Sequence, residues 1–219
     1  MANTRRHYWR YAGMFILCLL LASLATGLEL SSRLLAYVEE NFGTPARERL
    51  ESWERLVADK TELPELAQLE RVNEFFNQIP FKSDLEHWGK PDYWATPVEF
   101  LATNGGDCED YSIAKYMTLR ALGVPDDRMR ITYVHALELN QAHMVLTYYP
   151  EPGAEPLVLD NLIDEIQPAS MREDLRPVYS FNGEGLWLTQ REGGDRRVGQ
   201  ADSVDQWVDL RNRMIDVMR

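Results

Sequence analysis

The sequence predicts an α+β fold in which a helix beginning at a cysteine packs on an antiparallel sheet. Apolar residues at helical spacing occupy most of the chain before Pro125. After Pro125 the chain changes to short runs rich in β-branched and aromatic residues, separated by turns. Helices followed by strands with short connections are typical of α+β folds and not of βαβ alternation.

The bulk composition predicts one folded domain and excludes some functions. The 219 residues are 45% hydrophobic, which is enough for a core, and we expect a single domain over 28–219. The formal charge of −12 argues against a nucleic-acid partner, because phosphate binding needs a basic face. An acidic surface fits a soluble protein, a divalent cation or a basic partner.

Residues 1–25 have the pattern of a secretory signal. Arg5, Arg6 and Arg10 precede an uncharged apolar run, and small residues at Ser23 and Ala25 suit a signal peptidase. The uncharged stretch 11–28 is 18 residues long, near the lower limit for a membrane span, so an uncleaved anchor is the alternative. If the signal is removed, no direct membrane insertion is expected.

The helical segments can be placed in order. Residues 28–62 are helix-like, and 63–79 carry a clearer apolar stripe ended by Pro80. An irregular aromatic segment follows over 81–95. Thr96 and Glu99 then form a capping box for a short helix that ends near Thr103. The next helix starts at Cys108 and closes at Gly123.

The strands follow this last helix. Residues 130–134, 142–149 and 156–161 are strand-like, and two further candidates are 178–181 and 186–189. We expect a Gly- and Arg-rich loop over 191–200 and a final helix over 204–218.

Cys108 stands at a helix N-terminus directly after Gly105, Gly106 and Asp107. The helix dipole and the free backbone N–H groups favour a thiolate at this position. The other interpretation is a small buried cysteine on a well-capped helix. The only other cysteine, Cys18, lies in the signal, so a processed chain would keep one thiol that cannot form an internal disulfide. This favours a reactive Cys108.

His143 and Asp160 are the candidate partners of Cys108. A cysteine nucleophile needs a base, and the base needs a group that orients its ring. Adjacent antiparallel strands can bring His143, early in one strand, beside Asp160 at the end of the next. His135 is a rival base without a comparable acid downstream. Structural roles for His143 and Asp160 stay open on spacing alone.

The ordered motifs carry a family resemblance. They are 94–99 (Trp-Ala-Thr-Pro-x-Glu), 105–111 (Gly-Gly-Asp-Cys-Glu-Asp-Tyr), 142–146 (Ala-His-Met-Val-Leu) and 159–161 (Leu-Asp-Asn). Together they resemble the bacterial transglutaminase-like cysteine proteinases over about residues 64–190. The resemblance implies a papain-like fold in which Cys108 attacks a peptide carbonyl, His143 transfers the proton and Asp160 orients His143. The Cys108 backbone N–H is a natural oxyanion donor.

The same resemblance implies calcium dependence, with Asp107 and Glu109 as ligands. Asp107, Glu109 and Asp110 should raise the pKa of Cys108, and a bound dication would cancel that effect. The alternative is helix capping without a metal, with Asp107 as N-cap and Asp110 at the third helical position.

The family also implies a location and two protein partners. The location is the periplasm, reached through the N-terminal signal. The first partner is the N-terminal region of a large adhesin, cut to release the adhesin and disperse a biofilm. The second is an inner-membrane cyclic-di-GMP receptor that sequesters the protease. Two other functions remain open at this point: an acyltransferase with the same three residues, and a binding module without activity.

Overall fold

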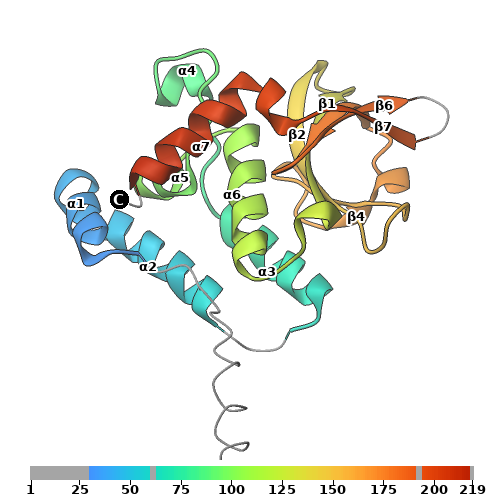
Figure 1. Cartoon of the computed structure of the whole chain (residues 1–219). Coiled ribbons are helices and arrows are strands. Elements are labelled where there is room, and N and C mark those ends of the chain that lie inside the picture. The colour runs from blue at the N-terminus through green and yellow to red at the C-terminus, as the bar shows by residue number, and fades with distance from the viewer. Residues whose placement is uncertain (1–29, 60–62, 191–193, 218–219) are drawn as a thin grey trace, which may run out of the picture.

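A computed structural model describes residues 30–59, 63–190 and 194–217. Helices gather on one side of a curved antiparallel sheet (Figure 1). The α+β prediction is confirmed, with the helices first along the chain and the strands after them. The proposed signal over 1–25 lies outside the described residues. Among the described helices, none combines the length and the apolar character needed to span a membrane.

The predicted helical region over 28–62 contains two helices. Helix α1 (Ser32–Phe42) and helix α2 (Thr44–Ala58) are separated by Gly43, whose φ is +85°. A positive φ is easily reached only by glycine, so the chain turns there. Helix α3 (Glu65–Asn77) follows and buries Leu69, Val72 and Phe76 of the predicted apolar stripe, whereas Leu66 is 50% exposed.

The segment before Cys108 forms two short helices. Helix α4 (Asp84–His87) lies within the irregular aromatic region. Helix α5 (Pro97–Thr103) begins with the predicted capping box, in which Thr96 accepts from the Glu99 N–H and the Glu99 carboxylate accepts from the Thr96 N–H at 2.7 Å. The long helix α6 (Cys108–Ala121) starts at the cysteine, as predicted, and packs on strand β2 (Gln141–Tyr148).

All neighbouring strands of the sheet run antiparallel. In spatial order the strands are β4 (Gln167–Pro168), β3 (Leu157–Leu159), β2, β1 (Met129–Ala136), β5 (Leu175–Phe181), β6 (Leu186–Gln190) and β7 (Gly194–Gly199). Strand β3 pairs with β2 only from Leu146 to Tyr148, so it leaves the beginning of β2 uncovered on that side.

Two expectations for the sheet need correction. The predicted loop over 191–200 contains β7, an edge strand that pairs with β6. Its Gly- and Arg-rich sequence has little strand propensity of its own, and hairpin pairing with β6 provides what the sequence lacks. Strand β5 also begins at Leu175, three residues before the predicted start at 178.

The C-terminal helix α7 (Asp205–Val217) returns to the helical side and crosses over α5 and α6 (Figure 1). Its Trp207 is 1% exposed and contacts the rings of Tyr116 and Phe181. The helix thereby joins α6 to the sheet in one core. The described part of the chain also contains three short 3₁₀ helices: η1 (Asp126–Arg128), η2 (Ala169–Met171) and η3 (Ala201–Ser203).

Candidate active site

The turn before α6 is closely packed around Gly106. A methyl group at Gly106 would lie 2.8 Å from the ring of Phe100 and closer still to the Asp110 carboxylate. The Gly106 carbonyl accepts from the Lys82 N–H at 2.8 Å, which ties the turn to the segment that follows α3. Only glycine fits here, so the residue fixes where α6 begins.

Cys108 is the first residue of α6 and is partly exposed. Burial, and then the neighbouring Glu109 carboxylate, raises the pKa of its thiol well above the usual value. The Met144 backbone N–H opposes this rise. That N–H belongs to the first part of β2, which does not pair with β3. The short β3 therefore leaves this N–H free to face the N-terminus of α6.

His143 and Asp160 come together as the sequence predicted. The ring Nε2 of His143 lies 2.8 Å from Asp160 Oδ1, and both residues are buried. Burial raises the pKa of Asp160, but hydrogen bonds from His143, the Leu162 N–H and Arg172 lower it to about 2. An ionised carboxylate can only accept, so Nε2 carries the proton and Nδ1 is left as the acceptor.

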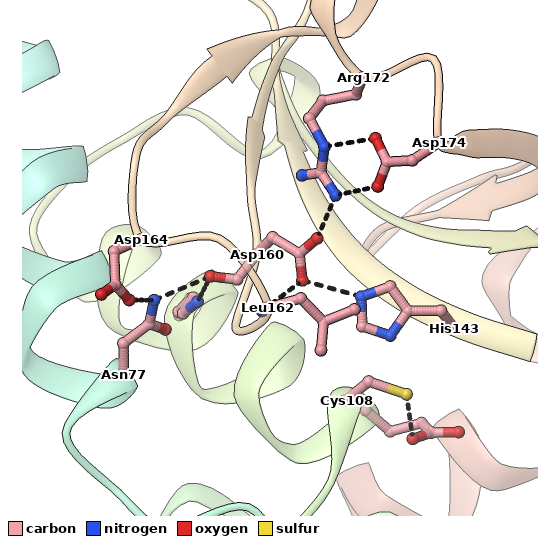
Figure 2. Close-up of polar contacts among 10 residues, drawn as sticks. Asn77, Cys108, His143, Asp160, Leu162, Asp164, Arg172 and Asp174 are labelled. Carbon is pink, nitrogen blue, oxygen red and sulfur yellow. Dashed lines mark hydrogen bonds and ion pairs between the residues drawn. The ribbon is translucent and has the colours of Figure 1, made fainter. Parts of the chain in front are cut away.

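The imidazole ring lies over the thiol, with its second nitrogen turned toward Cys108 (Figure 2). The thiol itself donates to Glu109 Oε2 at 2.9 Å. Within the described residues, no hydrogen bond joins Cys108 to His143 directly. The site therefore brings the candidate nucleophile and the candidate base to one place, with Glu109 as the acceptor for the thiol proton.

Asp160 has two further contacts that the sequence did not reveal. Arg172 Nη2 donates to Asp160 Oδ2 at 2.7 Å, and the same guanidinium bonds to Asp174 (Figure 2). Lys115, from α6, donates to the Asp160 carbonyl at 3.0 Å. Arg172 lies in a polar stretch without periodic pattern. Lys115 lies seven residues after Cys108 and hence on its helical face, a signal that could have identified it.

Four carboxylates surround the start of α6. Asp107 is the N-cap, and its N–H donates to Asp110 at 3.2 Å. Asp107 and Asp110 therefore cap α6 as the sequence indicated. Asp84, which the sequence did not single out, joins Asp107 and Asp110 in a set whose oxygens lie within 4.8 Å of one another. Asp107 and Glu109 also lie within that distance of the Cys108 sulfur.

The closeness and burial of these carboxylates make their ionised forms unfavourable in the absence of a cation. Burial and then Glu109 raise the pKa of Asp107 to about 8, and burial followed by the charge of Asp107 raises that of Asp84 to about 6. Burial also raises the pKa of Asp110. One buried oxygen of Asp84 and one of Asp107 lack a hydrogen-bond partner among the described residues. Such oxygens suit a hard dication such as Ca²⁺.

The other described histidines lie outside this group. His87 bonds to Thr103 Oγ1, and His135 is opposite Ala142 and Arg176 in the sheet. A cavity of about 710 Å³ among the sheet strands is lined by Arg172 but not by Cys108 or His143. The reactive groups are therefore concentrated where α6, β2 and the end of β3 meet.

A cysteine at a helix start, with a buried histidine on β2 paired to an aspartate directly after β3, is the arrangement of the papain-like cysteine hydrolases. A family model described as bacterial transglutaminase-like cysteine proteinase matches residues 47–174. The chain belongs to this family, and it is a cysteine protease.

Solved structures of Legionella pneumophila LapG agree with this assignment. One is 45% identical over 86% of this chain and 99% of its own, with a TM-score of 0.73. An EGTA-treated form has a TM-score of 0.74 and the same identity and coverage. A calcium-bound form is 45% identical over 84% of this chain and 99% of its own, with a TM-score of 0.72. Among the curated proteins, none matches the chain.

Proposed function

We propose that this protease is a periplasmic, calcium-dependent endopeptidase that cuts the N-terminal region of a large adhesin. The observation that carries the proposal is the 2.8 Å contact between His143 and Asp160 beside Cys108 at the start of α6. Similarity to LapG over most of the chain supports the protease activity, and the adhesin substrate and the periplasmic location are what the family resemblance implies. Control by an inner-membrane cyclic-di-GMP receptor completes the proposal.

The three residues divide the reaction among them. His143 Nδ1 takes the thiol proton, and Cys108 Sγ attacks the scissile carbonyl carbon. The protonated Nδ1 then gives its proton to the leaving amine, and an acyl-enzyme remains. Water, deprotonated by Nδ1, attacks the thioester, and the thiol regains its proton. Asp160 holds Nε2–H throughout and stabilises the imidazolium.

The negative oxygen of each tetrahedral intermediate needs a donor. Cys108 is the first residue of α6, so its N–H has no acceptor within the helix. This group is the first donor, and the helix dipole adds to its effect.

Asp107 and Glu109 would hold the calcium ion, and Asp84 and Asp110 form a second group of carboxylates around Asp107. The bound ion supplies positive charge that neutralises these carboxylates. Engagement of Glu109 would also remove the acceptor that competes with His143 for the thiol proton. Both effects favour the thiolate, whose pKa is raised in the ion-free arrangement.

The test is incubation of the protein with the N-terminal fragment of an adhesin encoded near its gene. We expect cleavage with calcium, little with EGTA, and recovery after calcium is added back. Cys108→Ala should abolish cleavage while the circular dichroism spectrum stays unchanged. Cleavage by Cys108→Ala would disprove the role of the thiol, and mass spectrometry of the products would show whether water or an amine resolves the acyl-enzyme.

The ligand assignment has its own test and control. Asp107→Asn and Glu109→Gln should each weaken calcium binding measured by titration calorimetry, whereas Glu138→Gln should not. Glu138 lies in the exposed turn between β1 and β2 and is well separated from Cys108 in the sequence. Unchanged calcium affinity in both site variants would remove these residues as ligands.

A further inference from the structure

Asp160 is contacted by two buried cations from different parts of the chain. Arg172, after η2, contacts its side chain, and Lys115, in the middle of α6, contacts its main chain. The two residues are 2% and 1% exposed. Buried cations cost desolvation energy, so their presence beside one carboxylate needs an explanation.

Arg172 holds the carboxylate in one orientation. Its Nη2 contacts Asp160 Oδ2 at 2.7 Å, while His143 and the Leu162 N–H use Oδ1 at 2.8 and 3.1 Å. The guanidinium is itself fixed by two hydrogen bonds to Asp174, at 2.9 and 2.8 Å. Each oxygen of Asp160 therefore has a defined partner, and the carboxylate cannot rotate without losing one.

Lys115 holds the main chain of the same residue. Its Nζ donates to the Asp160 carbonyl, which already accepts from Asn77 Nδ2 at 2.9 Å. The carbonyl thus has a neutral donor without the lysine. In the described residues no carboxylate lies within ion-pair distance of Nζ, although Asp160 and Asp164 attract its charge. Burial nevertheless lowers the pKa of Lys115 to about 7.

Lys115 also connects two parts of the site. It lies on α6, the helix that begins at Cys108, and reaches the chain immediately after β3. A helix that carries the nucleophile is therefore bonded directly to the residue that orients the base.

We propose that Arg172 and Lys115 are positioning residues, which hold Asp160 from its side chain and its main chain and so fix His143 against Cys108. This inference rests on the proposed roles of these three residues. In this proposal neither side chain needs to contact the substrate. Both act through Asp160 on the direction of the His143 ring.

The first test compares Arg172→Met and Lys115→Met with the exposed controls Arg176→Met and Lys90→Met. We expect kcat on the adhesin fragment to fall about 10- to 100-fold in the two site variants, with KM nearly unchanged, because misorientation acts on the reacting groups and not on substrate binding. The controls should behave as wild type. Arg172→Lys should recover part of kcat, since it keeps the charge but not the planar fork.

The second test needs no substrate. In protein labelled with ¹⁵N-histidine, the Nε2 proton of His143 shared with Asp160 should give a strongly downfield resonance. Both site variants should shift this resonance or broaden it, and the controls should leave it in place. This test separates the positioning proposal from the proposed function, because the resonance can be measured even if the protein does not cleave the adhesin.

Stability separates positioning from a structural role. Methionine resembles lysine in length and needs no hydration, so Lys115→Met should melt at or above the wild-type temperature while kcat falls. A lower melting temperature with wild-type kcat and resonance would overturn the role of Lys115. The same outcome for Arg172→Met would overturn that of Arg172. Should either variant fail to fold, Lys115→Gln and Arg172→Lys provide the same readouts with a donor retained.

Discussion

At the scale of single residues, Gly106 illustrates how tightly the start of α6 is specified. A Cβ atom there would meet the Phe100 ring and the Asp110 carboxylate, whereas the three atoms nearest to one at Gly105 all belong to the flexible side chain of Lys82. The two adjacent glycines thus differ in what a methyl group would displace. At Gly106 the methyl group would displace the core ring of Phe100 and the capping carboxylate of Asp110. At Gly105 it would displace the side chain of Lys82, which can move aside.

This difference gives a paired prediction. Gly106→Ala should lower the free energy of unfolding by about 1–3 kcal/mol through overpacking, and activity should fall because the Asp110 cap and Cys108 are displaced. Gly105→Ala should cost much less. Urea unfolding and proteolytic assays of both variants check this, and equal effects at the two positions would contradict it.

The sequence was most informative about residues whose chemistry is local or carried by a motif. Cys108, His143 and Asp160 were predicted and do come together. Arg172 and Asp84 were not, because their roles depend on contacts across 12 and 23 residues that no local pattern records. Asp107 was predicted both as a cap and as a ligand, and its geometry allows both.

At the scale of elements, the starts of α5 and α6 were predictable, and the edge strand β7 was not. The capping boxes at Thr96 and Asp107 lie where the sequence indicated, because a cap is decided by neighbouring residues. Strand β7 was missed because an edge strand forms through its partner β6. The break at Gly43 was also missed, since helical propensity continues on both sides of it.

Helix α7 supports the segment that leads to Cys108. Its Arg213 bonds to Glu99 at 2.6 Å and to the Tyr93 hydroxyl at 3.0 Å, and it also reaches the Trp94 carbonyl. Glu99 belongs to the capping box of α5. One arginine therefore connects the last helix to the cap of α5 and the loop before it.

We accordingly predict that Arg213→Met lowers the free energy of unfolding by about 1–3 kcal/mol, because several charge-assisted hydrogen bonds are lost from a partly buried position. Arg211→Met is the matched control on the same helix, since Arg211 pairs only with the exposed Asp202 among the described residues. Thermal melting of the two variants provides the comparison. A larger loss in Arg211→Met would refute this account of α7.

At the scale of the whole molecule, the formal charge of −12 is concentrated in part around Cys108. Asp84, Asp107 and Asp110 all have pKa values raised in the folded state, to about 6 for Asp84 and about 8 for Asp107. A carboxyl group with a raised pKa binds more protons in the folded state than in the unfolded one. Folding of the ion-free protein is therefore favoured at low pH and weakened as pH rises.

The pH dependence of stability should reveal this cluster. In EGTA we expect the melting temperature to fall as pH rises from about 4, the unfolded value, to about 7, because Asp84 and Asp107 keep protons in the folded state that the unfolded chain has released. Above about pH 7 the lowered pKa of Lys115 acts in the opposite direction. Saturating calcium should raise the melting temperature most at the alkaline end, because it binds the ionised carboxylates. Asp107→Asn should flatten the slope in EGTA. A melting temperature that rises from about pH 4 to about pH 7 in EGTA would contradict the assignment.

Trp207, which packs between Tyr116 and Phe181, comes later in the chain than all three residues of the proposed active site. Ribosomal synthesis delivers Cys108, His143 and Asp160 long before the residue that seals α6 against the sheet. A nascent chain can hold all three reactive groups while its core still lacks that indole. A copy of the chain that stops before Trp207 should therefore hold these three side chains without the packing that joins α6 to the sheet, and we expect it to lack proteolytic activity.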